Sequence, residues 1–213
     1  LTDLLGIEPL SSGMQLLEEH YDLASASQLV FEEIYSHLIS HLKTKTNGKN
    51  LILSGGSALN SVANGKVLKN SGFTNLFIPP MPDDSGISVG AALYVQNMII
   101  AEGPKVCMRN NYWGPSYSQD QIEEELKNYK IHYKYSASIE KDVAQLISDG
   151  MIVGWFQGSL EFGDRSLGNR SILADPRNPA MKDKVNRTIK YRENFRPFAP
   201  SVLLERANEL FTD

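Results

Sequence analysis

Apolar side chains recur every three or four positions over residues 27–42, a spacing that favours an amphipathic helix. The residues expected on its apolar face are Val30, Phe31, Ile34, Leu38 and Leu42. Beyond this helix, short apolar runs that are typical of buried strands alternate with helical patterns. The expected strands cover residues 51–53 and 76–78, and the expected helices cover 58–68 and 87–100. This alternation indicates an α/β unit.

A second unit is expected after Glu102-Gly103-Pro104, because glycine followed by proline typically ends an element. The pattern beyond it predicts helices over 120–129, 139–149 and 203–211, and strands over 131–135 and 151–156. Ser118 is a candidate N-cap for the first of these helices. The sequence is therefore expected to form two domains, 1–102 and 103–213.

Charge is distributed unevenly along the 213 residues, although 21 Lys and Arg nearly balance 25 Asp and Glu. Residues 1–102 contain no arginine, whereas residues 165–196 hold six arginines and three lysines against three acidic residues. This basic block argues for an anionic ligand. No apolar run approaches 18 residues, which argues against a membrane-spanning helix. The single cysteine, Cys107, excludes a disulfide framework and fits a cytoplasmic protein.

The first candidate binding site is the Gly55-Gly56 turn between the strand at 51–53 and the helix that follows. Backbone N–H groups at a helix start suit a phosphate, and glycine lets a ligand approach the main chain. Asn60 lies where its side chain can hydrogen-bond a ribose or a phosphate. The alternative is a tight turn that needs glycine for its geometry alone.

The second candidate site is a pair of carboxylates, Asp83 and Asp84, after the strand at 76–78. Oxygen ligands at a strand end commonly hold a divalent metal beside phosphates. The same acids would also match the dipole of a helix N-terminus without any metal. His37 and His41 have the i, i+4 spacing of metal ligands, but the periodicity of their helix already explains them.

The third candidate site is the arginine-rich stretch of residues 154–198. Its arginines alternate with glycine, asparagine and aromatic residues instead of following a helical period. Guanidinium groups on glycine-containing loops are well shaped to capture a phosphate or carboxylate with two hydrogen bonds. Scattered surface salt bridges are the alternative, and the density of arginine favours an oxyanion pocket.

A family resemblance extends over nearly the whole sequence. The run Gly-Trp-Phe-Gln-Gly-x-x-Glu-Phe-Gly-x-Arg-x-Leu-Gly-Asn-Arg over 154–170, with the segment 186–201, resembles the C-terminal domain of the O-carbamoyltransferases of nodulation and antibiotic biosynthesis. Residues 51–60 and 79–92 look like the family's strand–Gly-Gly–helix and Pro-Pro–Asp–Gly–Ala-Ala segments. The resemblance implies the second half of an actin/hexokinase-like (Kae1-like) ATPase domain, followed by a YrdC-like α/β domain.

The resemblance also implies an activity: carbamoyl phosphate and ATP give a carbamoyl-adenylate, which carbamoylates a hydroxyl of a small acceptor with the help of a divalent metal, Fe or Mg. Four arginines are expected to hold the phosphate and offset developing charge, namely Arg165, Arg170, Arg192 and Arg196. Further contacts to carbamoyl phosphate are expected from Gly158, Glu161, Gly168, Asn169 and Lys190. Contacts to nucleotide are expected from Gly55, Gly56, Asn60 and Asp84, with Asp84 also binding the metal.

Several features depart from the family pattern. The family's metal histidines form a His-x-x-x-His motif in the first half of the ATPase domain, so their role is not transferred to His37 and His41. The chain is therefore expected to be a fragment that binds carbamoyl phosphate without turnover. Asp164 replaces a usual proline and puts a negative charge beside Arg165; Ser166 replaces a usual alanine. Alternatives are a non-catalytic nucleotide- or anion-binding module and an RNA-binding domain, the latter disfavoured by overall acidity.

Overall fold

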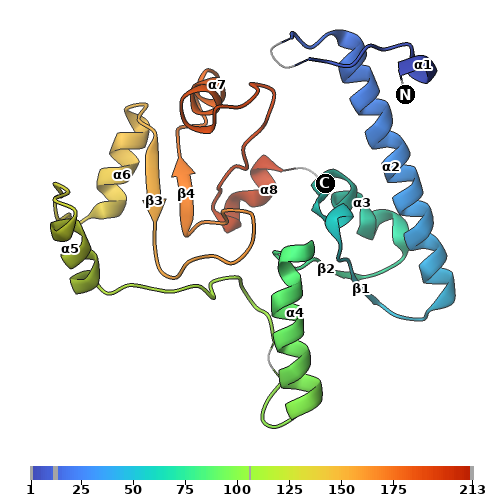
Figure 1. Cartoon of the computed structure of the whole chain (residues 1–213), viewed down its shortest axis with the longest axis horizontal. Helices are drawn as coiled ribbons and strands as arrows, with labels where there is room; N and C mark the ends of the chain where they lie inside the picture. The colour runs from blue at the N-terminus through green and yellow to red at the C-terminus, as the bar shows by residue number, and fades with distance from the viewer. Residues whose placement is uncertain (1, 12–13, 106, 212–213) are drawn as a thin grey trace. The chain divides into compact units, whose positions relative to one another are not determined.

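The chain divides into two compact units, residues 1–107 and residues 108–213 (Figure 1). The structure is a computed structural model and describes residues 2–11, 14–105 and 107–211. Helices and two small sheets make up the units, which is consistent with the expected α/β class. Within those described ranges, no helix is long and apolar enough to cross a membrane.

Unit 1 is built around a pair of parallel strands joined by a helical crossover. Its elements are α1 (Thr2–Leu5), α2 (Glu18–Lys45), β1 (Asn50–Ile52), the 3-10 turn η1 (Gly56–Leu59), α3 (Ser61–Ser71), β2 (Asn75–Phe77), the 3-10 turn η2 (Asp84–Gly86), α4 (Ile87–Tyr94) and the π-helical turn η3 (Val95–Ile100). Leu51 lies opposite Leu76 in the parallel ladder. Both strands lie within one residue of their predicted positions.

The core of unit 1 lies where α2 and α3 meet the strands. Its buried residues are Ile39, Leu51, Val67 and Phe73, with Tyr35, Leu53 and Leu76 packed against them. Full burial of one such aliphatic or aromatic side chain contributes about 1.5–3 kcal/mol to folding. This small core fixes the strand pair, and with it the turns that follow each strand.

The face of α2 that packs on the core differs from the one that the apolar spacing predicts. Ile39 is buried, and Tyr35 packs beside it and stacks on Phe31, with ring centroids 5.3 Å apart. The predicted face is exposed instead: Val30 53%, Ile34 57%, Leu38 60% and Leu42 46%. Two strands and α3 cover only one side of this helix. Of the predicted face, Phe31 is half-buried against Tyr35, whereas the other four side chains stay exposed. The helix also begins at Glu18 and not at residue 27.

The helix predicted over residues 87–100 is present but changes character along its length. It is α-helical from Ile87 to Tyr94 and π-helical from Val95 to Ile100, and it ends at Ala101, which has a φ of 54°. Helices that are apolar all round are normally buried. Much of this segment is nevertheless exposed, including Ile87 at 67%, Met98 at 67% and Ile99 at 65%.

Unit 2 contains one antiparallel strand pair with helices before and after it. Its elements are α5 (Gln119–Asn128), α6 (Ile139–Ser148), β3 (Val153–Phe156), β4 (Arg170–Leu173), α7 (Met181–Val185), the π-helical turn η4 (Asn186–Lys190), the 3-10 turn η5 (Leu204–Arg206) and α8 (Ala207–Leu210). Val153 lies opposite Leu173 and Phe156 opposite Arg170. The N-cap prediction is confirmed, because the side chain of Ser118 accepts the N–H of Gln121.

One strand of unit 2 was predicted in the wrong place. Residues 131–135 alternate polar and apolar side chains, but they form no strand. The strand that pairs with β3 is β4, which lies inside the arginine- and glycine-rich stretch and carries no strand-like alternation of its own. The predicted helix over 203–211 is reduced to η5 and the four-residue α8.

Candidate functional site

The parallel pairing of β1 and β2 brings the first two candidate sites together. The turn after β1 meets the loop after β2, because the N–H of Gly55 and the Oγ of Ser54 both donate to the carbonyl oxygen of Pro82, at 2.5 and 3.0 Å. The carboxyl ends of parallel strands are where α/β sheets commonly bind ligands. The Gly-Gly turn and the Asp83-Asp84 pair therefore form one edge of unit 1.

Two glycines at this edge have steric roles. Gly55 has a φ of 96°, a region that favours glycine, so the tight-turn interpretation holds at this position. A Cβ on Gly86 would lie 2.2 Å from the carbonyl oxygen of Met81, so a larger residue does not fit there. A Cβ on Gly55 or Gly56, by contrast, would meet no atom within 4 Å. The surface of the Gly-Gly turn is therefore open.

Asn60 is engaged in the fold. It is the N-cap of α3, and its Oδ1 accepts the N–H of Ala63 at 3.0 Å. Its side-chain amide also exchanges two hydrogen bonds with Gln28 of α2, at 2.8 and 3.2 Å. These contacts occupy the groups that the sequence assigned to a nucleotide. An asparagine directly before a helix is a capping signal that would have predicted this role.

The two adjacent aspartates differ in their surroundings. Asp83 is the N-cap of η2 and accepts hydrogen bonds from the N–H and the Oγ of Ser85, at 3.1 and 2.6 Å. Asp84 is exposed, and its carboxylate forms no hydrogen bond or ion pair with another described residue. The described part of the chain holds no cluster of three His, Cys, Asp or Glu side chains that could bind a metal ion. Asp84 could supply one ligand, but these residues alone do not fit a metal centre.

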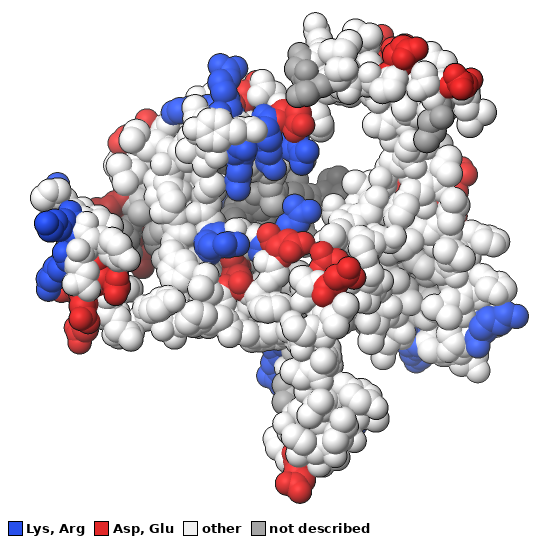
Figure 2. Space-filling view, in the orientation of Figure 1, with Lys and Arg blue, Asp and Glu red and all other residues white. Residues whose placement is uncertain are grey.

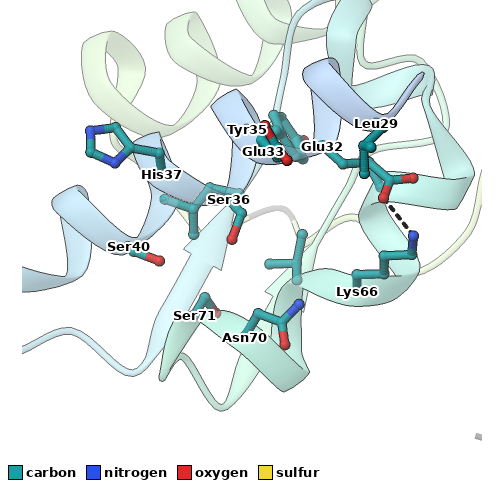
Figure 3. Close-up of a pocket in the computed structure, with 13 residues that line it drawn as sticks. Leu29, Glu32, Glu33, Tyr35, Ser36, His37, Ser40, Lys66, Asn70 and Ser71 are labelled. Atoms are coloured by element: carbon teal, nitrogen blue, oxygen red, sulfur yellow. Dashed lines mark hydrogen bonds and ion pairs between the residues drawn. The ribbon is translucent and has the colours of Figure 1, made fainter. Parts of the chain in front are cut away.

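A hollow of unit 1 lies away from these residues, between α2 and α3 (Figure 3). It has a volume of about 480 Å³, with Ile39, Ala63 and Val67 among its lining residues. One end carries the ion pair of Lys66 and Glu32 at 2.5 Å, and Figure 3 shows His37 at the other end. Hydrogen bonds from Gln28 and Lys66 lower the pKa of Glu32. None of the predicted ligand-binding residues lines this hollow.

In unit 2, two buried polar residues fix the loop that joins β3 to β4. The carboxylate of Glu161 accepts the N–H of Leu167 at 2.8 Å and the N–H of Arg170 at 3.3 Å. Asn169 donates from its side chain to the carbonyl oxygen of Ser159 at 2.8 Å. Glu161 is 9% exposed and Asn169 is 8% exposed. Two of the predicted carbamoyl-phosphate contacts therefore hold the loop in shape.

Glycines complete this loop. Gly158 has a φ of 61° and Gly168 a φ of 128°, both in the region that favours glycine. A Cβ on Gly158 would lie 3.4 Å from the side-chain nitrogen of Asn169. The loop is also tied to an earlier segment, because Phe162 donates to the carbonyl oxygen of Asn111 at 2.7 Å. Gly158 and Gly168, both predicted to contact carbamoyl phosphate, thus have backbone conformations that favour glycine.

The same loop presents two arginine side chains to solvent. Arg165 and Arg170 are exposed, and neither guanidinium forms a hydrogen bond or ion pair with another described residue. Asp164, the departure from the family pattern beside Arg165, is exposed and forms no ion pair with it. Glu161 holds the backbone from which the Arg170 side chain projects. Two unpaired guanidinium groups on a fixed loop suit a phosphate oxyanion.

A second loop, residues 186–198, is organised by a fully buried asparagine. Asn186 is 0% exposed; its Nδ2 donates to the carbonyl oxygen of Arg196 at 2.9 Å, and its Oδ1 accepts from the Nε of Arg192 at 2.7 Å. The guanidinium of Arg192 also donates to the carbonyl oxygen of Pro197 at 3.2 Å and lies over the ring of Phe198. The motif contained Asn186, but its organising role was missed because a polar residue gives no periodic signal.

The predicted cations of this loop are used in different ways. Arg192 stabilises the loop through the hydrogen bond from its Nε to Asn186. Arg196 forms an ion pair with Glu193 at 2.8 Å. The pKa of Glu193 is lowered, first by a backbone hydrogen bond and then by Arg196. Lys190 is exposed and forms no ion pair within the described ranges. Beside these residues is a hollow of about 460 Å³, whose lining residues are Arg187, Tyr191, Arg192, Glu193 and Asn194.

Basic side chains of unit 2 gather on one face. Figure 2 shows Lys and Arg over α7 and the segment that follows it, with few acidic side chains among them. The same stretch of sequence holds six arginines and three lysines between residues 165 and 196. Such a face raises the local concentration of anions and favours their binding.

Another arginine in this stretch has a structural role. Arg177 donates from its Nε and its terminal nitrogen to the carboxylate of Asp175, at 2.7–3.0 Å. The backbone N–H of Arg177 adds a further bond at 2.9 Å. The hydrogen bonds from the Arg177 side chain, and to a smaller extent the one from this N–H, lower the pKa of Asp175 from 3.8 to about 2. Arg177 is therefore not available to an anion.

Replacing Asp175 with asparagine should change how stability depends on acidity. The folded-state pKa of Asp175 lies below its unfolded value, so its ion pair stabilises the fold fully above pH 4 and is lost between about pH 4 and pH 2. We expect the thermal midpoint of the parent protein to exceed that of D175N at pH 6, with the gap closing between pH 4 and pH 2. Thermal unfolding followed by circular dichroism over pH 2–6 checks this, and a constant gap would contradict it.

Two family models match the chain in order. Residues 3–93 match the model described as "Carbamoyltransferase N-terminus", and residues 144–213 match the model described as "Carbamoyltransferase C-terminus". The first match contains the Gly-Gly turn and the two aspartates, and the second contains both loops of unit 2. All of the residues assigned to ligands in the sequence thus lie inside the matched segments.

Similar proteins support the same relationship. Over 99% of its length the chain is 41% identical to nodulation protein NolNO of Sinorhizobium fredii, of which it covers 31%. Over 98% it is 40% identical to an uncharacterized protein of Synechocystis, of which it covers 35%. Over 98% it is 39% identical to nodulation protein NolO of Bradyrhizobium diazoefficiens, of which it covers 38%. The chain therefore spans about a third of the length of these curated relatives.

Proposed function

Because the chain belongs to the carbamoyltransferase family, we propose that it is part of an enzyme that transfers a carbamoyl group from carbamoyl phosphate to a hydroxyl of a small molecule. The observation that carries the proposal is the loop between β3 and β4. It holds two exposed, unpaired guanidinium groups, Arg165 and Arg170, on a backbone fixed by the buried Glu161. This is a binding element for a phosphate ester or anhydride.

The residues of unit 2 divide into those that touch the substrate and those that position them. Arg165 and Arg170 bind the phosphate of carbamoyl phosphate and offset the charge that develops on it as the carbamoyl group leaves. Glu161 and Asn169 hold their loop, and Asn186 holds Arg192 at the edge of the second loop. Lys190, which is exposed, adds a positive charge to unit 2.

For unit 1 we propose contact with ATP at the Gly55-Gly56 turn. Its surface is open, and it lies beside the loop that carries Asp84. In this reaction water would cleave carbamoyl phosphate to carbamate and phosphate, and the carbamate would displace pyrophosphate from ATP to give a carbamoyl-adenylate. AMP would leave when the acceptor hydroxyl takes the carbamoyl group. Because the described residues do not fit a metal centre by themselves, Asp84 would hold a divalent metal only together with ligands from outside this chain. Asn60 is excluded from the nucleotide contacts in this proposal, because its side chain caps α3 and binds Gln28.

Titration calorimetry with carbamoyl phosphate tests the proposal. We expect the chain to bind this ligand with a dissociation constant in the millimolar range or tighter, because two charge-assisted contacts each contribute about 1.5–3 kcal/mol. Inorganic phosphate should compete for the same site. No heat of binding at millimolar carbamoyl phosphate would reject the assignment of the loop.

A second assay separates binding from catalysis. Release of pyrophosphate from ATP that depends on carbamoyl phosphate needs no acceptor and reports adenylate formation directly. We expect none above background from the 213-residue chain alone, since the described residues do not complete a metal centre. Pyrophosphate release at a steady rate would show that the chain is sufficient for the first half of the reaction. A non-catalytic anion-binding module would also bind carbamoyl phosphate without releasing pyrophosphate. Pyrophosphate release after addition of the rest of a family member would reject that alternative.

A further inference from the structure

The apolar stripe of α2 is a surface that the fold does not explain. It consists of Val30, Ile34, Leu38 and Leu42, spaced four residues apart and between 46% and 60% exposed. Residues four apart lie one above another on a helix. The stripe is therefore a continuous ridge along the middle of α2, on a different side of the helix from Tyr35 and Ile39, which pack into the core.

The stripe is separate from the hollow between α2 and α3. None of its four residues lines that hollow, whose contacts with α2 come from residues such as Glu32, Ser36 and Ser40 (Figure 3). The hollow has charged and hydroxyl groups at its rim, whereas the stripe is aliphatic. Contiguous aliphatic side chains on the surface of a protein mark a contact site.

The similar proteins indicate what lies on the stripe. Nearly all of this chain aligns with them, but it accounts for only 31–38% of their length. The stripe lies within residues 3–93, which match the family's N-terminal model. The remaining polypeptide of such an enzyme is therefore expected to pack close to this segment, and an aliphatic ridge is suited to a permanent contact inside a domain.

We propose that the stripe of α2 is the docking surface for the part of the carbamoyltransferase that this chain does not span, whether the same or a separate polypeptide supplies it. The partner surface is an aliphatic face of that part, packed over Ile34 and Leu38 at the centre of the ridge. This inference rests on the proposed function only through membership of the family. It requires no bound carbamoyl phosphate, so the binding of that ligand and the docking succeed or fail independently.

The test is association with the remaining polypeptide of nodulation protein NolO, outside the 38% that aligns with this chain. Analytical ultracentrifugation of the two purified proteins should show a 1:1 complex. The double variant I34E/L38E should weaken it at least about 100-fold, because two carboxylates would be buried in an apolar contact. The matched control is S25E/T44E, which adds the same two charges at exposed positions of α2 outside the row of residues that forms the stripe.

Circular dichroism and thermal midpoints establish that both variants fold, which is expected since all four positions are exposed. A complex that survives I34E/L38E as well as S25E/T44E would overturn the proposal. So would the absence of a complex. Self-association of this chain that I34E/L38E abolishes, without any binding of the NolO polypeptide, would assign the stripe to a second copy and also overturn it.

Discussion

Replacing Arg165 and Arg170 together with glutamine should reduce the affinity for carbamoyl phosphate by roughly 100-fold or more. In the proposed site each guanidinium would make a charge-assisted contact to the phosphate, and the loss of one such contact costs about 1.5–3 kcal/mol, or roughly 10- to 100-fold in affinity. Neither side chain forms an ion pair with another described residue, so the variant loses no contact that the fold uses. Calorimetry on the parent chain and the variant measures the effect.

The control for this variant is Arg109→Gln, which removes an exposed positive charge of unit 2 outside both loops. R109Q should bind carbamoyl phosphate within about twofold of the parent, since an exposed charge that makes no contact with the ligand is largely screened at physiological ionic strength. An equal loss of affinity in R109Q would mean that net charge alone drives binding. Unchanged binding in R165Q/R170Q would show that the loop between β3 and β4 does not hold the phosphate.

Replacing Asn186 with leucine should destabilise unit 2 by about 3 kcal/mol, the largest stability effect that we expect from a single substitution. Leucine has a similar shape, but it cannot bond the Nε of Arg192 or the carbonyl oxygens of Asn194 and Arg196. Because the Asn186 side chain is 0% exposed, those groups would lose their partner in a place that water does not reach. Urea unfolding monitored by circular dichroism measures the change in the free energy of unfolding.

Asn128→Leu provides the comparison for this substitution. Asn128 is exposed at the end of α5, so N128L should change stability by less than about 0.5 kcal/mol. N186L should also weaken carbamoyl-phosphate binding at temperatures where the protein is folded, because Arg192 is released from its position. Equal stability of N186L and the parent would contradict the organising role of Asn186.

The sequence was informative where local patterns determine structure. The apolar runs at 51–53 and 76–78 predicted both strands of unit 1 to within one residue, and Ser118 was recognised as a cap. The Gly-Gly turn and the aspartate pair were identified as separate sites. Their contact through Pro82 depends on the parallel pairing of the strands, which a local pattern does not specify.

The sequence was less informative where a residue can have two competing roles. Asn60 and Asn169 were assigned to ligands, but both side chains bond the backbone of this chain. Composition and spacing cannot separate an asparagine that caps or braces a loop from one that binds a ligand. The strand predicted over 131–135 failed for a different reason, since alternating side chains form a strand only when another strand is available to pair with them.

The face of α2 is an informative difference. The spacing of Val30, Ile34, Leu38 and Leu42 predicted burial, and the structure of this chain leaves these side chains exposed. A periodic pattern reports what the complete folded assembly buries. The chain spans about a third of its curated relatives, so the pattern and the structure differ where the proposed partner would pack.

The most direct test of the central claim is to locate bound carbamoyl phosphate on the chain by heteronuclear NMR. The amide resonances that shift during a titration should belong to the two loops of unit 2, residues 157–170 and 186–198, with the largest shifts near Arg165 and Arg170. Shifts confined to other segments, or no shifts at millimolar ligand, would contradict the assignment of this site.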